Sequence, residues 1–97
     1  MARFDVYEYS DDVPLLLDVQ ADLFSTLKTR VVVPLLPNAS TKLARLNPTI
    51  TVQGKAYVLM TTDIAALPTG SLGTVIANVE DQRQVVIDAL DFLLQGF

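Results

Sequence analysis

The chain has 97 residues and a net charge of −4, and it contains neither cysteine nor histidine. Hydrophobic residues make up 51% of it and charged residues 19%, which excludes an intrinsically disordered chain and fits one domain spanning residues 1–97. There is thus no disulfide, no thiol nucleophile and no imidazole or thiolate metal ligand, and scattered basic residues on an acidic chain argue against direct binding to nucleic acid.

The first two predicted elements are short strands. Residues 4–9 (FDVYEY) are rich in β-forming side chains and alternate in part, with Phe4 and Val6 on one face. A cluster of turn-forming residues, SDD, follows, and residues 15–20 (LLLDVQ) then resume the β pattern. The opening of the chain therefore predicts two strands joined by a solvated turn.

The next segment, residues 31–33 (VVV), is β-branched and predicts a buried strand. Pro34 and Pro37 follow it. Because proline donates no hydrogen bond to a ladder, we expect this strand at an edge or an end of the sheet. Residues 38–46 are expected to form a short helical turn with a hydroxyl side chain as its cap.

A β-hairpin is predicted in the middle of the chain. Residues 49–52 (TITV) and 55–61 (KAYVLMT) flank the pair Gln53-Gly54, and two such residues between β-rich runs favour a tight hairpin turn. The segment beyond it is punctuated by proline and glycine and is predicted to be a loop. These residues are Pro68, Gly70 and Gly73.

The last segment has a different period. Residues 80–94 contain no glycine or proline, and large apolar residues recur at steps of three and four, which predicts a helix that buries one face. The residues expected on that face are Val86, Leu90, Leu93 and Phe97. Asn78 is the expected N-cap, with Asp81 completing a capping box, and Gly96 is the expected C-cap.

The apolar content predicts an interaction surface. The mean hydropathy of +0.39 is high for so small a soluble domain, so we expect a partner or a second copy to cover part of the surface. The longest uncharged run, residues 64–79, is too broken by proline and glycine to span a membrane. The acidic N-terminus lacks the apolar core of a secretory signal, so a cytoplasmic location is expected.

Three stretches of the chain resemble the CcdB toxin family. They are residues 18–23 (DVQADL), residues 30–35 (RVVVPL) and residues 60–63 (MTTD), the last followed by Ala65 and then by residues 67–68 (LP). They occur in the family's order and spacing. The chain also ends as the family does, with a helix that runs into glycine and a large apolar residue. The resemblance therefore covers essentially the whole chain.

The resemblance implies a fold and a function. The fold is mainly β with one C-terminal helix, a small antiparallel barrel of the SH3-like type that CcdB and MazF toxins share. The protein would be a homodimer that binds the DNA gyrase A subunit and traps the gyrase–DNA cleavage complex, with no catalysis and no cofactor. A CcdA-like antitoxin would neutralise it through a disordered segment that folds on the toxin. The toxin–antitoxin complex would repress its own operon, so contact with DNA is indirect.

The resemblance also implies a gyrase-binding surface. Its residues are Leu23, Phe24, Asp91, Gln95, Gly96 and Phe97. The first two match an apolar pair that lies near the helix end in the family, and the last three match the family's gyrase-contacting tail. Gln95 departs from the best-known pattern, which has tryptophan there, so an aromatic stack on a gyrase arginine is lost. The alternatives are ordinary ones: a core pair, a solvated aspartate and a helix C-cap.

Other polar residues have simpler interpretations than chemistry. For Asp18, Asp22 and Arg30, a structural salt bridge or plain solvation is favoured over an acid–base role. Residues 61–63 (TTD) place hydroxyls beside a carboxylate, but no His or Lys stands next to them as a base. A turn whose side chains bond the backbone is therefore favoured.

Two alternative functions stay open. A MazF-like endoribonuclease would need cations to bind RNA and to stabilise the transition state at phosphorus, and the N-terminal candidates are Arg3, Lys28 and Arg30. A decayed toxin would still bind antitoxin but no longer harm gyrase, and the departure at Gln95 is consistent with that. The acidic balance and the three matching stretches favour the gyrase poison over the ribonuclease.

Overall fold

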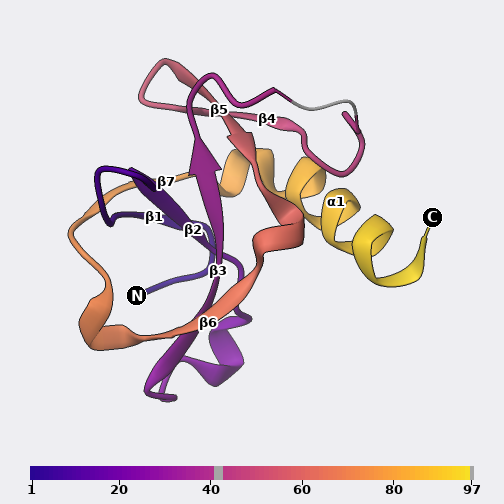
Figure 1. The fold of residues 1–97 in the computed structure, drawn as a ribbon. Helices are drawn as coiled ribbons and strands as arrows, with labels where there is room; N and C mark the ends of the chain where they lie inside the picture. Colours follow the sequence, from indigo (N-terminus) through magenta and orange to yellow (C-terminus); the bar gives the residue numbers. More distant parts are fainter. Residues whose placement is uncertain (41–42, 97) are drawn as a thin grey trace.

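The computed structural model describes residues 1–40 and 43–96 (Figure 1). The described chain forms a curled antiparallel sheet, a partial barrel, followed by one helix, α1 (Arg83–Gln95). The strands are β1 (Asp5–Glu8), β2 (Leu15–Asp18), β3 (Thr29–Leu36), β4 (Thr49–Val52), β5 (Lys55–Leu59), β6 (Ala65–Pro68) and β7 (Val75–Asn78). This confirms the predicted fold class of a mainly β protein with a C-terminal helix.

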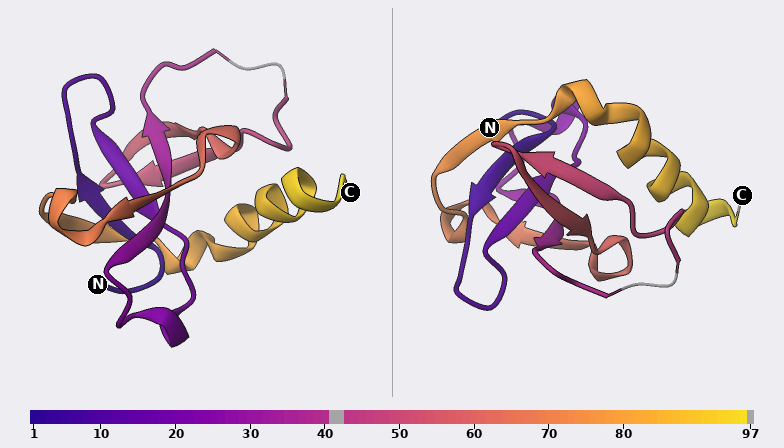
Figure 2. Two further views of the ribbon diagram at one scale, coloured as in Figure 1. Left: turned by 60° about the horizontal axis from the view of Figure 1, so that its bottom comes forward. Right: turned by 90° about the horizontal axis from the view of Figure 1, so that it is seen from above.

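The sheet has the strand order β4-β5-β3-β2-β1-β7, and β6 pairs with β3 beside β5. All of these pairings are antiparallel. Helix α1 packs on the barrel through Val86 and Ala89, which are fully buried, and then runs outward toward the C-terminus (Figure 2). No helix in the described residues has the length and apolar character needed to cross a membrane.

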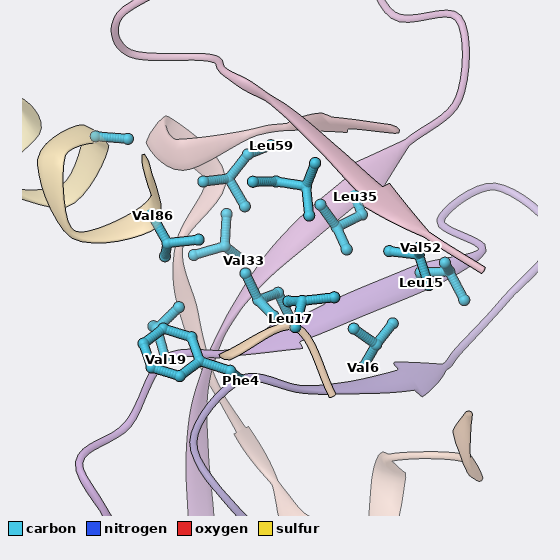
Figure 3. Close-up of a cluster of buried hydrophobic side chains, with 13 residues drawn as sticks. Phe4, Val6, Leu15, Leu17, Val19, Val33, Leu35, Val52, Leu59 and Val86 are labelled. Carbon is cyan, nitrogen blue, oxygen red and sulfur yellow. The ribbon is translucent and has the colours of Figure 1, made fainter. Parts of the chain in front are cut away.

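The main core lies inside the curl of the sheet (Figure 3). Strand β2 shows how it is built. Leu15 and Leu17 point into this core, while Leu16 points to the other face, because successive side chains of a strand alternate. On that other face Leu16 packs with Tyr7 and Val32 in a second, smaller cluster. Strand β2 is therefore buried on both sides and reads as a continuous apolar run.

The expectation that proline confines the VVV segment to an edge or an end of the sheet is wrong. Strand β3 is a central strand of eight residues with Pro34 inside it, paired with Leu16 of β2. On its other side β3 pairs with β6 up to Val32 and with β5 from Leu35. Pro34 lies where the partner changes, and its carbonyl accepts the N–H of Met60 at 2.9 Å. The missing N–H of proline thus falls in a gap between two ladders.

The hairpin prediction is confirmed, but the loop prediction after it is incomplete. β4 and β5 flank Gln53 (φ 51°) and Gly54 (φ 78°), and positive φ at both turn residues matches the twist of the strands. The proline- and glycine-punctuated segment contains two strands, β6 and β7, joined around a 3₁₀ turn at Thr69–Ser71. They were not predicted, because they owe their extended form to pairing with β3 and β1.

The helix begins later than predicted. A 3₁₀ turn, Glu80–Gln82, precedes α1, and no hydrogen bond from a described side chain caps the helix, so the capping box at Asp81 is not formed. The predicted N-cap, Asn78, instead ends β7, where its Oδ1 accepts the Glu80 N–H at 3.0 Å, and the residue at the N-cap position of α1 is Gln82. Of the predicted buried face, Val86 is fully buried and Leu90 and Leu93 are half-buried.

The predicted helical turn at residues 38–46 is only partly tested. Residues 41–42 lie outside the described residues. Residues 38–40 form no helix. Residues 44–46 form a turn, and the N–H groups of Leu46 and Asn47 both donate to the Leu43 carbonyl.

Side-chain amides bridge the gap between the two outer strands, β4 and β7. The Gln82 side chain accepts the Thr51 N–H at 2.9 Å and donates to the Thr51 carbonyl at 2.7 Å, as a neighbouring strand would. The Gln53 side chain donates to the Ile76 carbonyl of β7 at 2.9 Å. These bonds satisfy part of an open sheet edge and tie the start of α1 to β4.

Candidate functional site

Large apolar side chains reach solvent in two places that carry predicted site residues. One is the η1 loop, which we define as residues 21–28 between β2 and β3, at the foot of the molecule in Figure 1. There Leu23 is 84% exposed, Phe24 50% and Leu27 52%. The other is the end of α1, where Leu94 is 77% exposed. Neither place is core, so the core alternative for Leu23 and Phe24 is excluded.

The η1 loop is ordered by local hydrogen bonds. A 3₁₀ turn at Asp22–Phe24 is closed by bonds from the Phe24 N–H to the Ala21 carbonyl and from the Ser25 N–H to the Asp22 carbonyl, both 3.0 Å. The Asp22 carboxylate also accepts the backbone N–H of Arg3 at 2.8 Å, which ties the loop to the start of the chain. Asp22 therefore has a structural role.

A buried ionic network lies beneath this loop. Asp18 and Arg30 are both fully buried and form a bidentate pair, with Nε donating to Oδ2 at 2.7 Å and Nη2 to Oδ1 at 2.8 Å. The Tyr7 hydroxyl donates to the same carboxylate at 2.5 Å. Such a fork matches the planar geometry of a guanidinium and a carboxylate, while Nη1 of Arg30 is buried with no hydrogen-bond partner among the described residues. The predicted structural salt bridge is thus confirmed for Asp18 and Arg30.

Tyr7 and Arg30 keep their protons at neutral pH. Burial, with the hydrogen bond to Asp18 as the next cause, raises the pKa of the Tyr7 hydroxyl well above its ordinary value. The hydrogen bonds that the Arg30 guanidinium donates to the Asp18 carboxylate raise the pKa of Arg30. A neutral phenol and a permanent cation around one carboxylate hold a structure together, and neither group is poised to exchange protons near pH 7.

The end of α1 presents the second group of predicted residues. Asp91, Gln95 and Gly96 are exposed, and Phe97 lies outside the described residues. Gly96 adopts the left-handed conformation (φ 79°), and its N–H donates to the Phe92 carbonyl at 2.9 Å, so the predicted C-cap is confirmed. The guanidinium of Arg45 covers the Phe92 ring at 4.5 Å.

The two exposed regions are not adjacent within one chain. Asp22, next to Leu23, lines a polar cavity with Glu80 and Arg83, at the start of α1. Gln95 lies twelve residues later, about 18 Å along the helix. Within one chain, the η1 loop thus lies nearer the start of α1 than its C-terminal end.

Other candidate chemistry resolves into structure. Thr61–Asp63 forms a 3₁₀ turn in which the buried Thr61 hydroxyl donates to the Leu46 carbonyl at 2.5 Å, as the turn interpretation predicts. Within residues 1–40 and 43–96, no group of acidic side chains is arranged to hold a metal ion.

Sequence reasoning missed two members of the exposed regions, Leu27 and Leu94. Leu27 follows Phe24 by three residues in a segment with no strand or helix pattern. Leu94 lies outside the predicted buried face of the helix, and the helical periodicity could therefore have predicted its exposure.

Comparisons with known proteins agree with this architecture. The model of one protein family, described as CcdB protein, matches residues 3–96. A solved structure described as an endoribonuclease in complex with its cognate antitoxin, from Mycobacterial species, superposes with a TM-score of 0.80 at 18% identity, covering 97% of this chain and 94% of that one. Another, an endoribonuclease from Mycobacterial species, gives 0.80 at 16% identity, covering 97% and 90%. At such identities these structures show a shared fold.

Proposed function

Because this chain belongs to the CcdB family of toxin–antitoxin toxins, we propose that it poisons DNA gyrase by binding. In this proposal the toxin docks on the gyrase A subunit, traps the enzyme on cleaved DNA and performs no chemistry of its own. A binder that favours one state of a cycling enzyme shifts its population through differential affinity alone.

The observation that carries this proposal is the exposed apolar end of α1. Leu94 is 77% exposed, and it directly precedes Gln95 and Gly96, which are also exposed and which match the family's gyrase-contacting tail in position. A small protein gains nothing in stability from a solvated leucine at a helix end, whereas apolar anchors supply most of the energy of a protein interface. We assign Phe97 and Asp91 to the same proposed contact region as Leu94. Leu23 and Phe24, on the η1 loop, form a second and separate proposed contact region within one chain.

The endoribonuclease alternative is supported by the names of the two similar structures and opposed by the site. A ribonuclease needs cations that reach phosphate. Of the three N-terminal candidates, Arg30 is fully buried in its pair with Asp18. Arg3 covers the Phe4 ring at 5.0 Å and donates to the Val19 carbonyl, which leaves Lys28 as the exposed member of the three.

An antitoxin and a second copy complete the proposal. One structure of similar fold contains a cognate antitoxin, which supports an antitoxin of the CcdA type as the partner here, and with it autoregulation of the operon in the cytoplasm. A homodimer fits the high apolar content and a two-fold site on gyrase. Sedimentation equilibrium at micromolar concentration should give twice 10.6 kDa. A monomer at that concentration would remove the two-fold argument.

The experiment that tests the proposal compares two exposed apolar residues of α1. We expect the unaltered protein to cause gyrase-dependent cleavage of supercoiled plasmid and to leave RNA intact. Leu94→Ser should abolish cleavage, and Val85→Ser, at the other end of the helix and 43% exposed, should not. Both variants should melt near the parent temperature, since exposed substitutions change stability by about 0.5 kcal/mol or less. RNA degradation without plasmid cleavage would instead favour the ribonuclease.

A gain-of-function variant addresses the departure from the family. Gln95→Trp adds the aromatic ring at an exposed position, so it should leave the melting temperature unchanged and strengthen trapping of cleaved DNA. Trapping by this variant alone would identify the natural chain as a decayed toxin that binds only its antitoxin.

A further inference from the structure

The η1 loop has little apolar packing to hold it in place. Residues 21–29 are all exposed, and the three large apolar side chains, Leu23, Phe24 and Leu27, point to solvent. Its position on the barrel therefore depends on hydrogen bonds. An interface built on such a loop loses affinity if the loop must be ordered on binding.

One side chain joins this loop to the sheet. Gln20 is 7% exposed, and its Nε2 donates to the Phe24 carbonyl at 2.9 Å. Its Oε1 accepts the N–H of Val31 on β3, also at 2.9 Å. The Phe24 carbonyl accepts the Leu27 N–H as well, at 3.1 Å. The same oxygen atom therefore links the backbone at Phe24 and the backbone at Leu27 to Gln20.

Gln20 is in turn fixed by the buried network. Its backbone N–H donates to Oδ1 of Asp18 at 3.0 Å, and the Asp18 carboxylate is held by Arg30 and Tyr7. A continuous series of hydrogen bonds thus runs from the buried pair of Asp18 and Arg30, through Gln20, to the Phe24 carbonyl. Low dielectric strengthens such a network.

We propose that Gln20 is the positioning residue of a three-part apolar surface, Leu23, Phe24 and Leu27, and that it preorganises this surface for the gyrase A subunit. The part concerning gyrase rests on the proposed function. Leu27 becomes a contact residue, because the same carbonyl orders it together with Phe24. In this proposal Gln20 does not contact the partner. It lowers the free-energy cost of ordering the η1 loop when the partner binds.

The main test replaces Gln20 with a side chain of similar shape and no hydrogen bonds. In Gln20→Met, ¹⁵N relaxation should show the order parameters of residues 22–27 falling from about 0.85 to below about 0.6. Binding to the gyrase A subunit should weaken about tenfold, because ordering now accompanies binding.

Gln82→Met is the matched control. Gln82 also makes two hydrogen bonds to backbone with its side-chain amide, but on β4. The control should lose amide protection at Thr51 and keep both loop order and gyrase affinity.

Two further measurements keep the proposal open to refutation if Gln20→Met does not fold. Gln20→Glu keeps an acceptor for Val31 but places an oxygen against the Phe24 carbonyl, so it should loosen the loop selectively. In the unaltered protein, the Gln20 side-chain amide protons should exchange slowly with solvent and should show nuclear Overhauser effects to protons of Phe24.

An η1 loop that stays rigid in both Gln20→Met and Gln20→Glu would overturn the positioning role of Gln20. A loop that loosens without loss of gyrase affinity would overturn its link to binding. If the unaltered protein does not bind gyrase at all, the proposed function fails, and with it the preorganisation for gyrase, while the relaxation data still decide whether Gln20 positions the loop.

Discussion

Breaking the buried pair of Asp18 and Arg30 should be the most damaging conservative substitution in this protein. Asp18→Asn keeps the size of the side chain but leaves the Arg30 cation fully buried with no opposite charge. Removing one partner of a buried pair costs about 3–5 kcal/mol, against a total stability of roughly 5–15 kcal/mol for a domain of this size. At about 4–8 °C per kcal/mol, the melting temperature should fall by roughly 12–40 °C.

Urea unfolding followed by circular dichroism measures this cost directly. Asp91→Asn, on the exposed face of α1, is the matched control and should change the free energy of unfolding by less than about 0.5 kcal/mol. The double variant Asp18→Leu/Arg30→Met should be more stable than Asp18→Asn, because it leaves no buried charge. A cost below about 1 kcal/mol for Asp18→Asn would show that Arg30 escapes to solvent, and the network beneath the η1 loop would not be the anchor described here.

Three further outcomes are expected. Gly73→Ala places a Cβ 2.4 Å from the Glu8 carbonyl oxygen and should cost about 1–3 kcal/mol in urea unfolding, whereas Gly70→Ala, with nothing within 4 Å, should be neutral. Gly96→Ala should cost about 1 kcal/mol, because φ is 79° there with no steric contact. Burial raises the pKa of the Tyr7 hydroxyl above its unfolded value, so the contribution of Tyr7 to stability is complete below pH 10 and is lost as the pH rises above 10. In that range the difference in unfolding free energy between the parent and Tyr7→Phe should shrink by at most about 1.4 kcal/mol per pH unit.

The elements that sequence analysis found are those with local causes. The hairpin turn at Gln53-Gly54 needs positive φ, which glycine supplies at no steric cost, and the C-cap at Gly96 follows the same rule. The helix showed its period over three turns. β6 was missed because its four residues carry no alternation and its shape comes from pairing with β3. The prediction from Pro34 was wrong because β3 changes its partner from β6 to β5 at this position, and such a change of pairing depends on the tertiary fold and leaves no local sequence pattern.

The sequence could nominate candidate site residues, but it could not give their layout. Family motifs nominated Leu23 and Phe24 beside the tail residues, but exposure and distance depend on how β2 and β3 place the η1 loop. Gln20 was visible inside the first motif, yet a glutamine at the end of a strand has no signal that distinguishes a solvated amide from a buried one. Its bond to the Phe24 carbonyl exists only because the η1 loop turns back over it, and its bond to the Val31 N–H exists because β3 runs alongside.

The position of Arg30 bears on the choice between binding and catalysis. For Arg30 to serve at phosphate, it would have to leave Asp18 and reach solvent, and breaking a buried pair costs about 3–5 kcal/mol. Since each 1.4 kcal/mol is a factor of ten, the exposed state would be occupied in between roughly one in 10² and one in 10⁴ molecules. A transition state that depends on this cation would carry the same penalty in rate. Asp18 instead accepts the N–H of Gln20, whose side chain holds the Phe24 carbonyl of the η1 loop, and this arrangement favours the proposed binding function over catalysis.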